Sequence, residues 1–360
     1  MERKLASVQK ITGTSPIEGA DRIEIANVLG WQCVTQKSNN FKPGDLVVYF
    51  EIDSLIPIKP WSQFLQKKPE QTEARLKTIK LKGQFSQGLI LPLSAIELNG
   101  KPLEVEKFNE GDDLTELLEI KKWEPEIPAQ LRGQIVGLFP GFVSKTDETR
   151  IQSCPSVLEK NKGLVCFVTE KVDGSSITVF RVPRDTPGLP VKYLENNEDE
   201  WIFGVCSRNL CVARAEDNAF WKAVEMLDLK SKLESYGKPI VLQGELYGQG
   251  VQHNKLQVPT LRIAWFNVVD PVGRRYFNFD EFKQTIEELG LTTVPILDEN
   301  LILDHDVPQL VTMSIGKSKL NDKVWREGIV IRPKVEMQER HLGRFSFKVI
   351  NPEFLLKYDE

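Results

Sequence analysis

The sequence predicts an α+β protein in which a small N-terminal β-barrel precedes a larger domain built around an antiparallel sheet. Three observations support this: short strands bounded by turns over the first 120 residues, longer apolar runs after about residue 160, and a segment rich in proline and glycine between them. Helical spacing occurs at 217–236 and 279–289, without the regular strand–helix alternation of a parallel sheet. The 360 residues, 41 % hydrophobic and 27 % charged, suffice for two domains.

The N-terminal strands are short, and turn-forming residues separate them. Five short strands in about 100 residues are typical of a small barrel, and the OB type is the commonest barrel of that size that binds nucleic acid. Fold alone does not establish that use. The expected strands are Arg22–Val28, Trp31–Thr35, Asp45–Glu51, Leu76–Lys82 and Gly88–Pro92.

The segment from Lys121 to Pro140 carries three prolines and two glycines, which indicates a linker or the entry to a new domain. We place the boundary near residue 125, so that the domains are 1–125 and 126–360. Residues 183–200, with three prolines and an acidic end, are expected to form an exposed loop without a catalytic role. The buried strands expected in the second domain are Leu164–Thr169, Ile177–Val182, Pro239–Leu242, Arg262–Val269 and Gly328–Pro333.

Composition excludes several classes of protein. No apolar run approaches the roughly 18 residues of a membrane span, and the first residues do not resemble a signal peptide, so we expect a cytoplasmic protein that does not bind membranes. Five cysteines without a CxxC pair suit a reduced compartment. Since His253, His305 and His341 lack the spacing of zinc ligands, any bound metal should be a hard, oxygen-bound cation. The net charge of −4 excludes a uniformly basic nucleic-acid binder, but not a local basic groove.

One candidate for such a groove is a short basic segment in the N-terminal domain. Four cations fall within eight residues, so the segment is either an RNA contact or a solvated edge strand whose charges discourage aggregation. The four residues are Arg75, Lys77, Lys80 and Lys82.

The most informative local pattern is Glu170-Lys-Val-Asp-Gly174, which follows an apolar strand and begins a turn. Lys171 and Asp173 share one face of an extended chain because side chains alternate. A lysine amine is a good nucleophile only when neutral, and burial near cations or a metal ion lowers its pKa. A lone KxDG string should nevertheless occur by chance in roughly one chain in ten of this length, as an ion-paired hairpin turn.

Further motifs follow in a fixed order over about 180 residues. They are CSRN at Cys206–Asn209, QGELYG at Gln243–Gly248, AWFN at Ala264–Asn267, EGIVIR at Glu327–Arg332 and FSFK at Phe345–Lys348. With KxDG, this set resembles motifs I, Ia, III, IIIa, IV and V of the covalent nucleotidyltransferase superfamily, which includes polynucleotide ligases and mRNA capping enzymes. The chain is most similar to ATP-dependent RNA ligases, in the branch with an N-terminal OB domain.

Two features favour that branch over its relatives. The segment Lys145–Gln152, about twenty residues before Lys171, is similar to the RNA ligases' lead-in to motif I. DNA ligases and capping enzymes place an OB domain after motif V, whereas only twelve residues follow Lys348 here, so we expect no such domain. The resemblance therefore implies an antiparallel-sheet nucleotidyltransferase, or ligase adenylation, domain after the barrel.

The resemblance also implies a role for each matching position. Lys171 would be the nucleophile that accepts AMP, with Asp173, Glu245 and Glu327 holding Mg²⁺ or Mn²⁺, and Glu245 alternatively contacting the ribose. These types suit their tasks, because carboxylates bind hard cations, an aromatic face stacks on a purine and cations bind phosphate. The implied ATP contacts are Glu170 to adenine, Phe266 stacked on the base, Val330 on its other face, Arg208 to the sugar-phosphate, Arg332 to phosphate and Lys348 to the α-phosphate.

Several of these positions also allow a purely structural role without contact to a ligand. Phe266 lies in an apolar run where aromatic residues usually belong to the core, and Arg332 precedes a proline and would also suit the surface. Arg150 and Gln152 would either contact RNA or nucleotide or serve local structure. At Glu170, the neighbouring backbone would recognise adenine as well as the side chain.

The chain departs from its relatives at two positions. Ser176 stands where some RNA ligases have an asparagine that senses the nick, and Ser346 replaces the first lysine of motif V. Arg344 shares a predicted strand face with Ser346 and Lys348, so one hypothesis is that it supplies the missing charge.

The function implied is an ATP-dependent RNA ligase that seals 5′-phosphate to 3′-hydroxyl ends of RNA, at nicks in a duplex whose splint strand is either RNA or DNA, through lysyl-AMP and RNA-adenylate intermediates. We expect it to act as a monomer. The alternatives are a DNA ligase or capping-type guanylyltransferase, and a catalytically silent RNA-binding protein that retains the scaffold.

Overall fold

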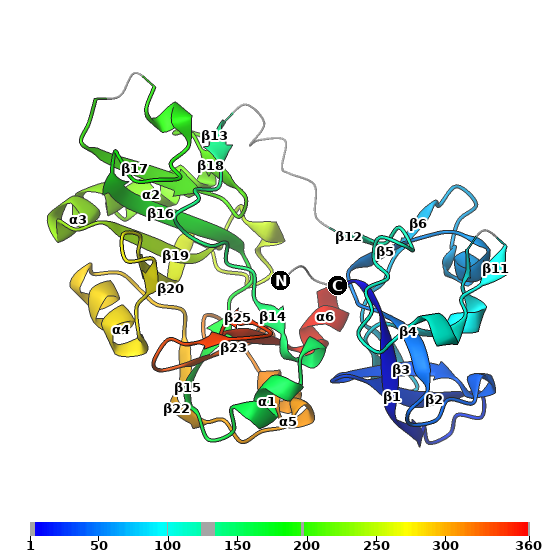
Figure 1. The fold of residues 1–360 in the computed structure, drawn as a ribbon. Coiled ribbons are helices and arrows are strands. Elements are labelled where there is room, and N and C mark those ends of the chain that lie inside the picture. The colour runs from blue at the N-terminus through cyan, green and yellow to red at the C-terminus, as the bar shows by residue number, and fades with distance from the viewer. Residues whose placement is uncertain (1–3, 99, 124–133, 196–197, 359–360) are drawn as a thin grey trace.

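The computed structural model describes residues 4–98, 100–123, 134–195 and 198–358, which form two domains side by side (Figure 1). The N-terminal domain contains a curled five-stranded antiparallel sheet and a smaller three-stranded sheet. In spatial order, the larger sheet is β3 (Trp31–Gln36), β2 (Ile23–Val28), β1 (Ala6–Pro16), β4 (Leu46–Phe50) and β9 (Leu89–Pro92). The smaller sheet is β12 (Lys121–Lys122), β5 (Ser54–Pro57) and β6 (Glu73–Arg75), and two hairpins add β7 (Ile79–Leu81) with β8 (Gln84–Ser86) and β10 (Glu97–Leu98) with β11 (Lys101–Pro102).

Four of the five strands expected here are present within one or two residues at each end. The fifth expectation, one strand over Leu76–Lys82, was wrong: β6 ends at Arg75, and the shorter β7 is followed by Lys82 at a φ of 48°. Strand β1, at the centre of the large sheet, was not predicted. Its first four residues, Ala6 to Gln9, are all buried, so they lack the polar alternation that marks a half-buried strand.

The second domain consists of two antiparallel sheets with one parallel pair at an edge. The seven-stranded sheet is β13 (Ile135–Leu138), β18 (Leu210–Val212), β17 (Trp201–Cys206), β16 (Ser175–Pro183), β19 (Ile240–Tyr247), β20 (Arg262–Asp270) and β21 (Arg275–Tyr276). The five-stranded sheet is β14 (Thr149–Arg150), β26 (Phe347–Ile350), β23 (Gly328–Pro333), β15 (Val165–Lys171) and β22 (Ile296–Ile302), and β24 (Gln338–Glu339) pairs with β25 (Gly343–Arg344). The α+β prediction and the five strands predicted for this domain are confirmed.

Helices pack against these sheets, and the last of them lies toward the N-terminal domain (Figure 1). The helical stretch predicted at 217–236 is two helices, because Asp228 adopts a φ of 47° that no continuous helix accepts. The stretch at 279–289 is one helix, which begins with a capping box between Asn278 and Glu281. The helices are α1 (Ser156–Lys160), α2 (Ala219–Met226), α3 (Leu229–Tyr236), α4 (Phe279–Glu288), α5 (Val307–Ser314) and α6 (Pro352–Tyr358), and the 3₁₀ turns are η1 (Lys37–Asn39), η2 (Pro60–Leu65), η3 (Leu93–Ala95), η4 (Val105–Lys107), η6 (Ile151–Ser153), η7 (Val191–Tyr193) and η8 (Gln252–Asn254).

The segment 183–200 is more structured than the exposed loop that its composition predicts. It contains η7, and the ring of Tyr193 packs edge-on against Phe180 with 5.7 Å between centroids. The expected exposed loop is otherwise confirmed, since none of the described residues in this segment is buried.

The two domains share an apolar interface. Ile350 and Leu355, at the end of β26 and in α6, belong to the same buried cluster as Trp31 and Tyr49 of the N-terminal domain. Gly30 approaches η6 so closely that a Cβ there would lie 2.9 Å from the Gln152 Cα, and its backbone N–H donates to the Gln152 carbonyl at 2.9 Å. Only glycine allows this contact.

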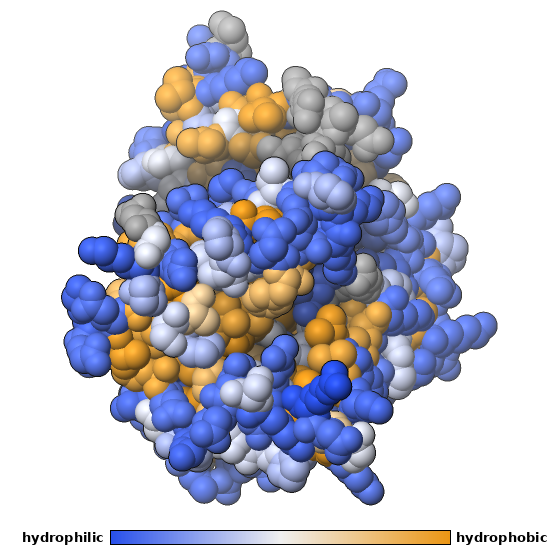
Figure 2. Space-filling view, turned by 90° about the vertical axis from the view of Figure 1, so that its right-hand side faces the viewer, coloured by the Kyte–Doolittle hydropathy of each residue, from blue (hydrophilic) through white to orange (hydrophobic). Residues whose placement is uncertain are grey.

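The surface on the N-terminal side of the molecule, seen in Figure 2, interleaves apolar patches with hydrophilic residues. No helix in the described part of the chain is long and apolar enough to cross a membrane. The boundary predicted near residue 125 lies outside the described residues. β12, at 121–122, still pairs within the first domain, and β13, from 135, pairs within the second.

Candidate active site

The register of the five-stranded sheet gathers four predicted residues on one face. Thr169 lies opposite Val330, which lies opposite Lys348, which lies opposite Arg150. Directly opposed residues point to the same side of a sheet, and Lys171, two residues after Thr169, shares that side. Lys171, Val330, Lys348 and Arg150 therefore form one surface, although up to 198 positions separate them in the sequence.

Lys171 is the last residue of β15, and its amine is held by one carboxylate. Nζ donates to both Glu327 oxygens, at 2.7 and 2.6 Å, and the two side chains are only 24 % and 15 % exposed. Burial lowers the pKa of Lys171, but Glu327 and Glu245 together more than offset this, so the pKa is raised above its ordinary value. Without a ligand, the amine is thus stored as an ammonium ion.

Asp173 and Glu245 complete the acidic part of the site. Gly174 presses against β19, where a Cβ would lie 2.2 Å from the Leu246 carbonyl oxygen, so glycine lets the Asp173 turn approach Glu245. Burial, followed by the negative charges of Glu327 and Asp173, raises the pKa of Glu245 to about 8, despite the opposing effect of Lys171. Asp173 also accepts a hydrogen bond from Lys255 at 3.2 Å.

Lys348 faces Lys171 across the same surface. Burial, then the positive charges of Lys171 and Arg150, lowers the pKa of Lys348 to about 7. A buried cation with a depressed pKa, among other cations, recovers stability when an anion binds. The arrangement therefore suits a phosphate.

Phe266 reaches the site through a β-bulge in β20. Gln243 pairs with Asn267, but the next residue, Gly244, pairs with Trp265, which leaves Phe266 as the extra residue. Bulges redirect side chains and occur often beside active sites. The Phe266 ring packs against Val172 and Val294 but stays half-buried. It therefore belongs in part to the core and keeps part of its surface available for stacking.

Arg332 is buried and fully engaged by protein groups. It donates to the Phe266 carbonyl at 2.8 Å, to Glu148 at 3.0 Å and to the Ser346 hydroxyl at 2.9 Å. The surface location considered for Arg332 is therefore wrong, since the residue is 3 % exposed. Its phosphate role stays a prediction.

Arg344 does not supply the charge missing at Ser346. Its guanidinium binds both carboxylate oxygens of Glu336 and donates to Asn267 at 3.0 Å, and it stacks on Tyr276 at 3.7 Å. Because these groups already engage the guanidinium, the structure does not support the hypothesis. The cause is the break between β25 and β26, which ends the strand alternation on which the hypothesis relied.

Glu170, the predicted adenine contact, is buried against a loop. Ser318 Oγ donates to one carboxylate oxygen and the Lys319 N–H donates to the other at 2.7 Å. Burial raises the pKa of Glu170, opposed by these two hydrogen bonds. Both oxygens are therefore bound to the loop, and the adenine contact stays a prediction.

The hairpin between β17 and β18 brings Arg208 to the mouth of the site, where it pairs with Asp147. Burial raises the pKa of Asp147, but the positive charges of Arg208, Lys122 and Lys348 together lower it by more, so the pKa lies below its ordinary value. Asp147, Glu148 and Lys122 were not named as site residues from the sequence. The first two lie in the lead-in segment, which was their only signal. Ser176, at the nick-sensing position, shares a 2.7 Å hydrogen bond with Thr146.

The N-terminal domain contributes directly to this surface. Asp53 accepts hydrogen bonds from Arg150 at 3.0 Å and from Arg75 at 2.8 Å, and Glu51 accepts one from Ser153 at 2.6 Å. A hydrogen bond to Asp53 of the N-terminal domain thus holds Arg150 in place beside Lys348. Gln152 is buried at the contact with Gly30, which favours its local interpretation.

The four basic residues predicted to contact RNA do not form one strand surface. Arg75 is 16 % exposed and stacks on Trp123 at 3.5 Å, while Lys80 lies over Phe85 and pairs with Glu353 of α6 at 3.6 Å. Lys77 is half-buried and Lys82 is exposed. Contact with RNA stays a prediction for all four.

The carboxylates fit a divalent cation that binds together with a substrate. Among the described residues, no group of three or more His, Cys, Asp and Glu side chains forms a metal cage. Mg²⁺ usually takes only one or two carboxylates, with substrate oxygens and water completing its shell. Burial, with a further contribution from Glu327 and Asp173, raises the pKa of Glu245, and a cation bound beside it would favour its ionised form.

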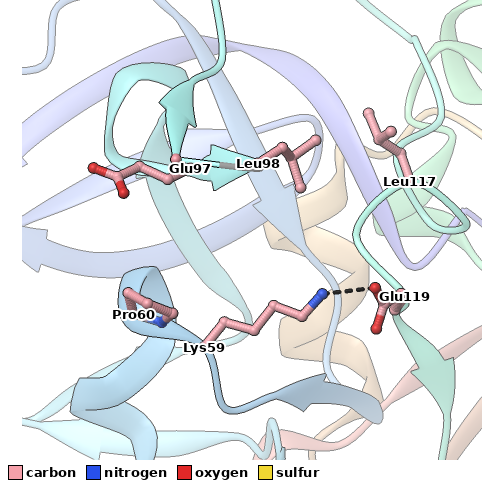
Figure 3. Close-up of a pocket in the computed structure, with 7 residues that line it drawn as sticks. Lys59, Pro60, Glu97, Leu98, Leu117 and Glu119 are labelled. Carbon is pink, nitrogen blue, oxygen red and sulfur yellow. Dashed lines mark hydrogen bonds and ion pairs between the residues drawn. The ribbon is translucent and has the colours of Figure 1, made fainter.

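A separate hollow lies on the N-terminal domain, away from these residues. Lys59, Pro60, Glu97, Leu98, Leu117 and Glu119 line it, and Lys59 bridges to Glu119 at 2.7 Å (Figure 3). Lys59 and Glu119 already neutralise each other, and none of the predicted site residues lines this hollow.

Comparisons with known proteins agree with the two-domain arrangement. A family model described as an OB-fold domain matches residues 5–93, and one described as RNA ligase matches residues 165–350. A search of curated proteins gave no match.

Solved structures of an RNA ligase from Naegleria gruberi match along the whole chain. A mutant with AMP and Mn is 35 % identical with a TM-score of 0.84, and the match covers 99 % of each chain. A mutant with ATP and Mn has the same identity, coverage and TM-score, and the ligase with PPi is 36 % identical with a TM-score of 0.82 and the same coverage. The family expected from the motifs is confirmed: this chain, with its N-terminal OB-fold domain, belongs to the RNA ligase family.

Proposed function

We propose that this RNA ligase uses ATP to join 5′-phosphate and 3′-hydroxyl ends of RNA in nicked duplex, through an AMP adduct on Lys171. The observation that carries the proposal is the environment of Lys171: a half-buried amine held by Glu327, with Lys348 and Arg150 on the same sheet face. Solved relatives at 35 % identity with ATP or AMP and Mn support the choice of nucleotide and metal.

In the first step, Lys171 Nζ attacks the α-phosphorus of ATP and pyrophosphate leaves. Lys348, with its pKa near 7, gains a full charge when phosphate oxygens arrive, and Arg150 adds a second cation on the same face. Phe266 offers a ring for the base, and Val330 packs from the five-stranded sheet. Mg²⁺ or Mn²⁺ held by Asp173, Glu245 and Glu327 would neutralise phosphate oxygens and lower the pKa of Lys171.

In the later steps, AMP passes to the RNA 5′-phosphate and the 3′-hydroxyl then displaces it. The chain's task in both steps is to hold two RNA ends in line, which needs positioning and charge rather than a histidine base. The N-terminal domain, fixed against the site through Asp53, provides a second surface for the duplex. We propose that one copy of the chain is sufficient.

The first test is labelling with α-labelled ATP and Mn²⁺. The wild-type protein should retain label after denaturation, because the bond to Lys171 is covalent, and Lys171→Ala should retain none. Lys162→Ala is a matched control, since that exposed lysine pairs with Asp304 in the same domain. Label on Lys171→Ala, or a preference for GTP, would contradict the proposal, the latter in favour of a capping-type enzyme.

The second test is sealing of nicked duplexes in which each strand is either RNA or DNA. We expect sealing when the 3′-hydroxyl strand is RNA, and loss of sealing when it is DNA. Equal rates on an all-DNA nick would favour a DNA ligase. Labelling without sealing on any nick would reject the nicked substrate and leave the adenylation step intact.

A further inference from the structure

Two cysteines form a cross-strand pair at the base of the hairpin that carries Arg208. Cys206 ends β17, Cys211 lies in β18, and the two are registered partners with Sγ atoms 3.2 Å apart. Both side chains are fully buried. The sequence contains no CxxC motif, so it is the hairpin that brings these two thiols together.

The hairpin's hydrogen bonding makes this pair suitable for a disulfide. The Ser207 N–H donates to the Leu210 carbonyl at 2.8 Å, so 207 and 210 form a hydrogen-bonded pair. The next pair, Cys206 and Cys211, is therefore of the non-hydrogen-bonded kind, whose Cα atoms lie about 4.5 Å apart. Disulfides span Cα separations of about 4.4–6.8 Å, so the bond can form with only a small shift of the backbone.

The two thiols also differ in reactivity. A hydrogen bond from Cys206 lowers the pKa of Cys211, whereas burial raises the pKa of Cys206. While protonated, the Cys211 thiol donates a hydrogen bond to the Leu138 carbonyl at 3.3 Å. By contrast, burial raises the pKa of Cys33 and of Cys166. Cys211 is thus the better nucleophile of the pair, with Cys206 placed to resolve its oxidised form.

We propose that Cys206 and Cys211 are a reversible dithiol–disulfide site that responds to hydrogen peroxide. The Cys211 sulfur attacks one peroxide oxygen, the O–O bond breaks, and the products are a sulfenic acid and water. The Cys206 thiol then attacks that sulfur, forms the S–S bond and releases a second water. Two thiols lose two electrons, and both peroxide oxygens are reduced to water.

The disulfide would act on the nucleotide site through the hairpin tip, an effect that rests on the proposed function. Arg208 pairs with Asp147, and Asn209 accepts a hydrogen bond from Lys145 at 2.9 Å. Bond formation draws the sulfurs from 3.2 Å to about 2.05 Å, which tightens the hairpin's base and shifts its tip. We expect weaker use of ATP, because Arg208 is the residue aligned with the sugar-phosphate contact.

The experiment oxidises the folded, full-length protein with hydrogen peroxide and maps its peptides without reduction. The expected product is a 206–211 crosslink, lighter by two hydrogen atoms and removed by dithiothreitol. The KM for ATP in adenylation should rise about tenfold, the scale of one charge-assisted hydrogen bond, and should return on reduction. Cys206→Ala should not respond, whereas Cys33→Ala, a matched buried thiol without a cysteine partner, should respond like the wild type.

The outcomes separate the inference from the proposed function. Absence of the crosslink in native protein, or its appearance only after denaturation, would overturn the site. A crosslink that leaves the KM for ATP unchanged would overturn its effect on the active site. If the reduced wild-type protein forms no lysyl-AMP, the proposed function fails, while peptide mapping still decides whether the disulfide forms.

Discussion

Two groups of buried charged residues meet β23 at its two ends, the Lys171 group through Glu327 just before the strand and the Arg332 group near its end, and their charges are arranged in opposite ways. Around Lys171, like charges are crowded: the pKa of Lys348 falls to about 7 through burial and neighbouring cations, and that of Glu245 rises to about 8 through burial and neighbouring carboxylates. Around Arg332, opposite charges alternate. Burial opposes ionisation of Glu148, but Arg332 and Arg344 hold the pKa of Glu148 below its usual value.

The difference separates a ligand site from a frame. The hydrogen bonds of Arg332 are all to protein groups, so the residue links β20, β23 and the lead-in segment without a ligand. In the Lys171 group the pKa values of Lys348 and Glu245 stay strongly shifted, and we propose that a nucleotide and a cation relieve these shifts. Perturbed pKa values of this kind cluster at functional sites, where stability is lost for activity.

The largest expected effect is on the frame. Glu148→Ala leaves the guanidinium of Arg332 buried without its carboxylate, and removing one partner of a buried pair costs about 3–5 kcal/mol. The free energy of unfolding, measured in urea, should fall by that amount. Glu159→Ala, on the exposed part of α1, is the control and should change little. A loss below about 1 kcal/mol would show that the Arg332 group is not the frame.

Next come the acidic residues of the ligand site. Asp173→Ala, Glu245→Ala and Glu327→Ala should each slow sealing by about 10²-fold or more, equivalent to roughly 3 kcal/mol, because each removes charge that organises the metal and phosphates. Unlike Glu148→Ala, Glu245→Ala should not destabilise the protein, because burial makes the ionised Glu245 carboxylate unfavourable in the folded state, as its raised pKa indicates. Single-turnover sealing and urea unfolding on the same preparations test both parts, and near-normal sealing would reject the metal ligands.

The smallest effect is a gain in stability. The pKa of Lys348 is about 7 in the folded protein against an ordinary 10.5, so between these values only the unfolded chain is protonated and folding becomes more favourable as pH rises. Lys348→Met should raise the melting temperature by about 2–4 °C below pH 7, a gain that disappears toward pH 10. It should also impair adenylation.

The control for this prediction is Lys162→Met. Lys162 is exposed, and its hydrogen bond to Asp304 raises rather than lowers its pKa. If the melting temperatures of Lys348→Met and the wild type depend on pH in the same way, the depressed pKa is contradicted. The contrast between the two groups would then be lost.

Motif order and local chemistry were readable from the sequence. The motifs from KxDG onward resemble those of the RNA ligases and so predicted the family, which the comparisons confirm. The nucleophile and the acidic residues that the resemblance implies stay predictions. The strands that carry Lys171, Glu245, Phe266 and Arg332 were also predictable, since long apolar runs dominate them.

Only the tertiary structure decided the partners of these residues. Strand register placed Lys348 and Arg150 on the face of Lys171, a bulge that no residue pattern marks delivered Phe266, and a domain contact held Arg150 on Asp53. Arg344, which strand alternation aimed at the site, instead bound Glu336 after the strand broke. Spacing along a chain determines which side chains share a face over a few residues, whereas pairing between distant strands and domains depends on burial and hydrogen bonding of the whole fold.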